Sequence, residues 1–167
     1  EPVPSLASWK VSKDGKTYTY KLKEGLKWSD GVPITAQHFW DSWERLLNPK
    51  TASGYAYFLF DIEGAKEYSE GKILDPSTLG FRVLDGRTFQ VKLKKRATYF
   101  ATIPAFTVTF PIRKDLIEKY GRLWTEPEKM VVTGPFRLSA WKHDASIEMV
   151  PNPHYRGARP KLEKVIA

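Results

Sequence analysis

The side chains best able to carry chemistry in this sequence are few and scattered. The three histidines are His38, His143 and His154, and none stands at a metal-ligand spacing from another histidine or a carboxylate. Cysteine is absent, which excludes disulfides, thiol catalysis and cysteine metal sites. Carboxylate pairs such as Asp61 and Glu63 occur, but such pairs more often lie on a solvated surface than in an active site. We therefore predict no catalytic site, no metal site and no cofactor, and a protein that is not an enzyme.

The charge balance is strongly basic. Twenty-seven Lys and Arg residues against 19 Asp and Glu residues give a formal net charge of +8 in a chain of 167 residues. The densest basic run lies within residues 92–96, and acidic residues punctuate most of the rest. A basic excess without a nucleic-acid-reading motif favours a solvated surface, so we predict no nucleic-acid partner.

The sequence does not open with a recognisable signal peptide, and no apolar run is long enough for a membrane span. The first ten residues, "EPVPSLASWK", have neither a basic region nor an apolar stretch. Two interpretations stay open at this point. The protein is cytosolic, or the sequence is a processed or excised segment of an exported one.

Three of the six tryptophans lie in one short stretch, "LKWSDGVPITAQHFWDSWERLL", residues 26–47. Such a cluster is either a platform for a ligand or the interior of a fold. From Thr35 the apolar residues recur at the spacing of one helical face, with Asn48-Pro49 as the end. Burial of Trp40 and Trp43 on that face is the favoured interpretation.

The remaining sequence alternates hairpins and helices. Asp-Gly turns predict hairpins around residues 7–22 and 83–93, and a third hairpin is expected within 134–152. Further helices are expected from about Tyr55 to Tyr68 and over residues 113–121, the latter ending at a glycine. The pattern predicts an α+β chain without the strand–helix alternation of a doubly wound fold.

The tryptophan-rich stretch also identifies a family. "LKEGLKWSDGVPITAQHFWDSWERLLNPKTASGYAY" (22–57) resembles the extracytoplasmic solute-binding proteins of family 5, which serve ABC transporters for oligopeptides and dipeptides. Two further stretches resemble the same family in the same order: "LGFRVLDGRTFQVKLKKRATYF" (79–100) and the run from "FPIRKDLIEKYG" to "NPHYRGA" (110–158). The resemblance covers essentially the whole chain.

The resemblance implies a fold and a division of the chain. Members are two lobes around a cleft, a periplasmic-binding-protein type II-like fold, with an extra subdomain on the first lobe. Residues 1–111 would be that extra subdomain and residues 112–167 part of the first lobe. The N-terminal strands and the second lobe would be absent, so the chain would be a fragment.

Only one ligand-binding residue is carried over from the family. The tyrosine of the family's "TASPYA" segment contacts the bound peptide and corresponds to Tyr55 in "TASGYA". An ordinary half-buried helix tyrosine is the competing interpretation. Gly54 replaces the usual proline, which loosens the approach to Tyr55. His38 replaces an acidic residue three positions after the capping Thr35, so the reciprocal carboxylate bond of a capping box is lost.

The implied function is capture of oligopeptides or dipeptides outside the cytoplasm and their delivery to a membrane ABC permease. The implied location is periplasmic or extracellular, with a lipoprotein anchor as one form of it. We expect this fragment to bind peptide weakly or not at all. A ligand-sensing module of a transcription regulator and a structural fragment without its own ligand stay open as alternatives. The ligand class also stays open among peptides, nickel complexes, haem and sugars.

Overall fold

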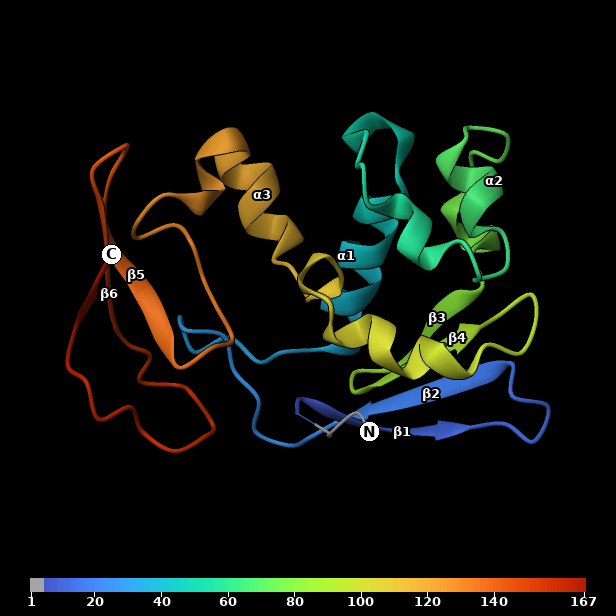
Figure 1. Cartoon of the computed structure of the whole chain (residues 1–167), viewed down its shortest axis with the longest axis horizontal. Coiled ribbons are helices and arrows are strands. Elements are labelled where there is room, and N and C mark those ends of the chain that lie inside the picture. The colour runs from blue at the N-terminus through green and yellow to red at the C-terminus, as the bar shows by residue number, and fades with distance from the viewer. Residues whose placement is uncertain (1–4) are drawn as a thin grey trace. The chain divides into compact units, whose positions relative to one another are not determined.

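The computed structural model in Figure 1 describes residues 5–167 and divides the chain into two units. The first unit is formed by Glu1–Lys23 and Thr35–Ile112, and the second by Glu24–Ile34 and Arg113–Ala167. Residues 24–34 belong to the second unit, because hydrogen bonds described below tie this segment to the C-terminal residues. The identity of residues 1–111 as an extra subdomain and of residues 112–167 as part of the first lobe stays a prediction.

The first unit is built on a four-stranded antiparallel sheet with strand order β1-β2-β4-β3. Strands β1 (Ala7–Val11) and β2 (Thr17–Leu22) form one predicted hairpin, and β3 (Phe81–Asp85) and β4 (Thr88–Lys92) form the other. The two hairpins join through β2 and β4, which the sequence did not predict. Alternate side chains of each strand point to opposite faces, so one face of the sheet is apolar and the other polar.

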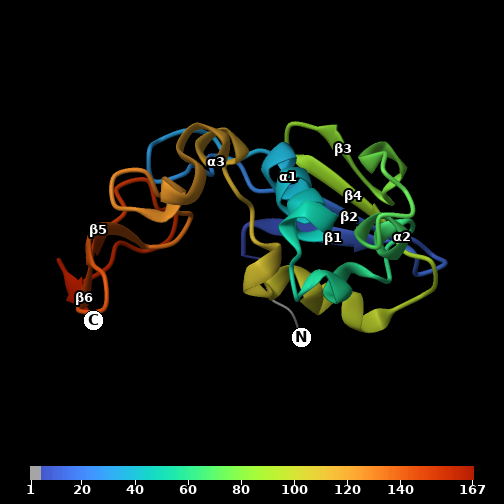
Figure 2. The same ribbon diagram turned by 90° about the horizontal axis from the view of Figure 1, so that it is seen from above.

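The apolar face is covered by α1 (Ala36–Leu47), as Figures 1 and 2 show. The helix follows Thr35, whose backbone is extended, and ends at Asn48, as predicted. The predicted loss of the reciprocal cap bond needs a correction. The Thr35 N–H donates to Nδ1 of His38 over 3.0 Å, so an imidazole nitrogen takes the place of the expected carboxylate oxygen.

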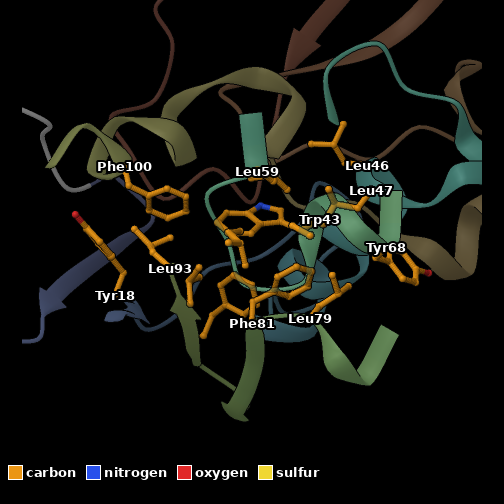
Figure 3. Close-up of a cluster of buried hydrophobic side chains, with 14 of the residues drawn as sticks. Tyr18, Trp43, Leu46, Leu47, Leu59, Tyr68, Leu79, Phe81, Leu93 and Phe100 are labelled. Carbon is orange, nitrogen blue, oxygen red and sulfur yellow. The ribbon is translucent and has the colours of Figure 1, made fainter. Parts of the chain in front are cut away.

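The core of the first unit surrounds Trp43, which is 1% exposed. Figure 3 shows its indole among labelled side chains from the sheet, α1 and the connecting segments. Its ring centroid lies 5.8 Å from that of Phe81, 5.1 Å from Phe89 and 6.3 Å from Phe100, all in edge-on arrangements that aromatic pairs prefer. Trp40 is half-buried and packs against the same cluster. Trp43 is therefore a core residue, as predicted, and Trp40 packs partly buried against that core.

The single helix expected over residues 55–68 is wrong. The structure has a 3-10 helix, η2 (Ala56–Leu59), and a short α-helix, α2 (Ala65–Ser69), with turns connecting them. In that connection Ile62 forms an antiparallel bridge with Leu93, next to the end of β4. The segment has the apolar periodicity of a helix, but between the two short helices Ile62 pairs with Leu93, just beyond the end of β4.

Gly64 fixes the start of α2. Its φ is +72°, a left-handed conformation that other residues adopt at a cost. A Cβ at this position would also lie 2.9 Å from the Thr78 carbonyl oxygen. The chain thus needs glycine here, and the helix cannot extend back through it. The other 3-10 helices of this unit are η1 (Pro49–Thr51), η3 (Pro76–Thr78), η4 (Thr98–Ala105) and η5 (Thr107–Thr109).

The second unit begins with a turn that is tied to the C-terminal part of the chain. Ser29 N–H donates to the Val132 carbonyl over 2.9 Å, and Val132 N–H donates back to the Ser29 hydroxyl over 3.1 Å. The Arg113 guanidinium contacts Asp30 at 2.7 Å and holds Asp115 through two further hydrogen bonds of 2.8 and 2.7 Å. These contacts explain why residues 24–34 belong to this unit.

The rest of the second unit contains a helix and a small sheet. Helix α3 (Lys114–Tyr120) ends at Gly121, as predicted, and continues as a 3-10 turn, η6 (Gly121–Thr125). Strands β5 (Phe136–Lys142) and β6 (Ser146–Pro151) form the predicted third hairpin, and the short β7 (Val165–Ile166) adds to β6. Across residues 5–167 the helices are all too short or too polar to serve as a transmembrane span.

Candidate ligand-facing site

Tyr55, the one candidate from the sequence, stands at the start of η2 in the first unit. After α1 the chain makes the η1 turn, and Ala52 then adopts a left-handed conformation with φ of 50°. The Ser53 hydroxyl accepts a hydrogen bond from the Tyr55 N–H over 3.3 Å. The Tyr55 side chain itself is 50% exposed. Its ring is therefore presented to solvent by a short, locally hydrogen-bonded turn.

Tyr55 belongs to an exposed aromatic cluster, which we define as Tyr55, Tyr57, Phe58 and Phe106. The Tyr55 ring centroid lies 6.2 Å from Phe58 and 6.1 Å from Phe106. Phe58 lies 4.5 Å from both Tyr57 and Phe106. Tyr57 is 57% exposed and Phe106 39% exposed. Clustered aromatic rings at a surface are unusual enough in a soluble fold to mark a candidate contact site.

Two buried anchors hold the η2 part of this cluster. Ala56 and Leu59 alternate with the exposed rings and are buried in the core, Leu59 completely. The Tyr55 carbonyl accepts a hydrogen bond from the Phe58 N–H over 3.2 Å. One side of η2 is therefore fixed in the core while the other side offers its rings outward.

The core tryptophan of α1 holds the segment that carries Phe106. Trp43 Nε1 donates to the Thr109 carbonyl over 3.0 Å, and the Thr109 hydroxyl donates to the Phe106 carbonyl over 2.7 Å. Ser42 adds a 2.6 Å hydrogen bond to the Phe110 carbonyl. The tryptophan thus supports the site without facing it.

A polar contact connects the chain after η2 to η4. The Tyr99 hydroxyl donates a hydrogen bond to the Asp61 carboxylate, and this bond raises the pKa of Tyr99 above its ordinary value of 10.0. Phe106 directly follows η4. The contact between Asp61 and Tyr99 therefore helps to fix Phe106 relative to the rings at η2. The Asp61–Glu63 pair noted in the sequence thus serves structure, since Glu63 is ion-paired with Lys92 at 3.0 Å.

The geometry at Gly54 shows how much room the missing proline leaves. A Cβ at Gly54 would meet no atom within 4 Å, and its φ lies outside the left-handed region. The glycine is therefore not required by the fold. The expectation that it loosens the approach to Tyr55 stays a prediction.

The histidines do not assemble into a site. His38 caps α1 in the first unit, whereas His143 and His154 lie in the second. His143 Nε2 lies 3.1 Å from Glu126 and its ring stacks against Trp141. No group of three or more His, Cys, Asp or Glu residues that could hold a metal ion occurs within residues 5–167. The aromatic cluster, with its phenol groups, is suited to stacking and hydrogen bonding.

Sequence reasoning found Tyr55 but missed its neighbours Tyr57, Phe58 and Phe106. Phe106 lies 51 positions after Tyr55 in the sequence, in the apolar run "PAFTVTF". An apolar run of this kind predicts buried side chains. The spacing of its residues does not indicate that the Phe106 ring will be exposed. The proximity of the two segments is a result of tertiary packing.

Comparison with known proteins gives relatives of much greater length. The chain is 39% identical over 153 residues to the probable deoxycholate-binding periplasmic protein YgiS of Escherichia coli. The aligned residues make up 90% of this chain and 28% of YgiS. The chain is also 39% identical over 157 residues to the periplasmic oligopeptide-binding protein OppA of Escherichia coli, with 92% and 28% covered. The chain thus spans about three tenths of the length of these relatives.

Solved structures agree with this relationship. Listeria monocytogenes OppA bound to peptide superposes with a TM-score of 0.92 at 31% identity, covering 99% of this chain and 33% of that chain. The predicted fold class is confirmed, since the chain is α+β and matches part of a type II periplasmic binding protein. The family model for bacterial extracellular solute-binding proteins, family 5 Middle, matches residues 1–167. The chain belongs to the family 5 bacterial extracellular solute-binding proteins.

Proposed function

We propose that this chain is part of an extracytoplasmic binding protein that captures oligopeptides or dipeptides and delivers them to an ABC permease in the membrane. The observation that carries the proposal is the family match over the whole chain. Relatives named for oligopeptide binding and a related structure bound to peptide support the ligand class. The periplasmic names of the relatives support a location outside the cytoplasm.

We infer a binding role rather than a catalytic one. The relatives are named for what they bind, and the candidate site offers aromatic faces and hydroxyl groups. Lobe closure over a ligand is a shift between open and closed populations, driven by contacts made only in the closed state. Residues of this chain would supply one wall of such a cleft.

Tyr55 is the residue we propose to contact the ligand. Its phenol can stack along an extended peptide and hydrogen-bond to peptide backbone groups without reading side chains, which suits broad specificity. Its 50% exposure and its support by η2 are consistent with that role. The proposed identity of the first unit is the extra subdomain of the first lobe, and that of the second unit is a piece of the lobe itself.

The test uses the full-length protein that contains this segment, with peptide affinity measured by calorimetry. We expect Tyr55→Ala to weaken binding about tenfold or more, from lost stacking and one hydrogen bond worth together about 1–3 kcal/mol. Tyr55→Phe, which keeps the ring, should lose only about fivefold. Leu74→Ala is the control and should leave the affinity unchanged, because Leu74 is an exposed apolar residue of the first unit that lies outside the aromatic cluster. Unchanged affinity in Tyr55→Ala would remove Tyr55 from the site.

A titration of the 167-residue chain alone tests the expectation that one wall binds poorly. Binding pays the entropic cost of association whether or not the second wall is present. We therefore expect weak or undetectable binding of peptide. Micromolar affinity would contradict this expectation and place the whole site within this chain.

A second ligand class is favoured by one relative. YgiS is named as a probable deoxycholate-binding protein, and it shares 39% identity with this chain. An amphipathic steroid would use the exposed aromatic cluster through its apolar face. Competition between deoxycholate and peptides in the same calorimetric experiment separates the two ligand classes.

A further inference from the structure

The polar face of the four-stranded sheet has an unusual composition. Cross-strand partners share a face, so the registers of the three strand pairs define its rows. We call this surface the outer face. Its members are Ser8, Lys10, Thr17, Thr19, Lys21, Arg82, Asp85, Thr88, Gln90 and Lys92. Among these paired positions every side chain is polar, and four are basic against one carboxylate.

The outer face points away from the helices of its own unit. In Figure 1, α1 and α2 lie on the other side of the four strands. The alternate residues Tyr18, Tyr20, Phe89 and Val91, which point to the opposite face, are buried. The basic residues of the outer face are all exposed. A sheet needs only one buried face, so this second face is available for another role.

The single carboxylate of the outer face is already engaged. Asp85 Oδ1 accepts a hydrogen bond from the Arg87 N–H over 2.8 Å in the β3–β4 turn. That bond, together with one from Thr88 and the charge of Lys21, lowers the pKa of Asp85. Lys92 is ion-paired with Glu63 at 3.0 Å, whereas Lys10, Lys21 and Arg82 leave the face with a clear positive excess.

Arg82 is held in place by a network across three strands. Its Nε and Nη2 donate to Oε1 of Gln90 over 3.1 and 2.8 Å, and Gln90 Nε2 donates to the Thr19 hydroxyl over 3.2 Å. These hydrogen bonds restrict the conformations of the Arg82 side chain. Pre-ordered donors lose less conformational entropy when a partner binds.

The basic side chains are spread out rather than convergent. Lys10 and Arg82 lie in one row across the sheet, on its two edge strands. Three interstrand spacings separate them, and each spacing is about 4.8 Å. Lys21 and Lys92 lie at opposite ends of the face on the two central strands. A small anion needs donors that converge on one point, whereas a dispersed planar array matches a planar charged surface.

We propose that the outer face docks onto the anionic headgroups of a phospholipid bilayer. Each Lys or Arg near such a surface adds a comparable increment of attraction, and the attraction falls off within a Debye length. Contact across the outer face would hold the protein flat against the membrane surface. This role does not depend on the identity of the transported ligand.

The test measures partitioning onto vesicles made of equal parts of phosphatidylcholine and phosphatidylglycerol at low salt. The variant replaces Lys10, Lys21 and Arg82 by Gln, and the matched control replaces Lys50, Lys66 and Lys72, which are exposed residues outside the sheet in the same unit. Both variants lose the same net charge. We expect at least about a tenfold loss of partitioning for the outer-face variant and less than about twofold for the control. Equal losses would show that only net charge matters and would overturn the proposal.

A variant that is expected to strengthen partitioning distinguishes lost membrane contact from lost folding, because a misfolded protein would not bind more strongly. Asp85→Asn keeps an oxygen that can accept the Arg87 N–H, removes the one carboxylate of the outer face, and should strengthen partitioning up to about fivefold. Vesicles of phosphatidylcholine alone should bind neither protein. Unchanged or weaker binding by Asp85→Asn contradicts the proposal.

Inorganic phosphate separates a bilayer from a discrete anion site. At equal ionic strength, phosphate should displace the protein from vesicles no better than chloride does. Stronger displacement by phosphate would show a small-anion site instead, and absence of any vesicle binding would leave an acidic protein surface as the partner. Either result overturns bilayer docking.

Discussion

The two units of this chain are stabilised in different ways. The first unit contains nearly all of the fully buried apolar side chains, gathered around Trp43 against one face of a sheet. In the second unit the buried apolar residues are Leu26, Trp28 and Ile34, and the strands β5 and β6 are half-buried along most of their length. The buried side chains Arg113 and Asn152 make polar contacts there instead. Cavity formation should therefore dominate mutational effects in one unit, and unpaired polar groups in the other.

The largest effect is expected at Trp43. Trp43→Ala removes a buried indole and its hydrogen bond to Thr109, and we expect a loss of about 3–5 kcal/mol in the free energy of unfolding. Chemical denaturation measures the loss, and hydrogen exchange shows whether it is confined to the first unit. Trp40→Ala is the control, because Trp40 is only half-buried. An equal loss in the two variants would contradict the expectation that the more deeply buried tryptophan contributes more to the free energy of unfolding.

A smaller effect is expected at Arg113. Arg113→Met removes charge-assisted hydrogen bonds to Asp30 and Asp115, whose carboxylates are exposed enough to become hydrated, so we expect about 2 kcal/mol. Hydrogen exchange should quicken at α3 and leave the four-stranded sheet unchanged. Arg113→Lys should recover only part of the loss, because lysine lacks the planar fork. Faster exchange throughout the first unit would contradict the separation of the two units.

The cap of α1 should contribute less. His38→Ala removes the acceptor for the Thr35 N–H, with an expected cost of about 1 kcal/mol. His38→Glu should restore the bond with a carboxylate and add a favourable charge at the helix N-terminus. Thermal unfolding of the unmodified protein, His38→Ala and His38→Glu measures their order of stability. A Glu variant no more stable than the Ala variant would show that the imidazole contact does not cap the helix.

The smallest expected effect is a decrease in the stability of the second unit at low pH. The hydrogen bonds from Arg113 lower the pKa of Asp115 below its ordinary value of 3.8. Because the folded-state pKa is the lower one, the stabilisation is complete above the ordinary value and is lost as the pH falls through the folded pKa. Arg113→Met should flatten this acid slope. Hydrogen exchange at α3 across the acid range gives the measurement, and an unchanged slope would assign the acid sensitivity to other carboxylates.

Local chemistry was predictable where it acts over neighbouring residues. The Asp14-Gly15 turn, the amphipathic spacing from Ala36 to Leu47 and the glycine after Tyr120 all gave elements that the structure confirms. The expected helix over residues 55–68 failed because Ile62 pairs with a residue 31 positions away. Apolar periodicity indicates which residues are buried, and a segment that bridges to a distant part of the chain can be buried without being helical.

The candidate site divides in the same way. Tyr55 was identified by a resemblance carried on contiguous residues, whereas Phe58 and Phe106 joined it only through packing. The fate of Trp43 was predicted as burial, but its hydrogen bond to the Phe106 segment depends on how η5 crosses α1. The imidazole cap at His38 was missed because the expected partner was a carboxylate.

The sequence by itself determined the family, the hairpins, the position of α1 and the burial of its tryptophans, because these depend on residue order and on turn, cap and periodicity chemistry. Tertiary structure alone decided that residues 24–34 join the second unit and that the two hairpins merge into one sheet. It also decided which aromatic rings stay exposed beside Tyr55 and that four basic residues share one exposed face of the sheet. These features arise from contacts between segments far apart in the chain, and no local pattern encodes which segments will meet.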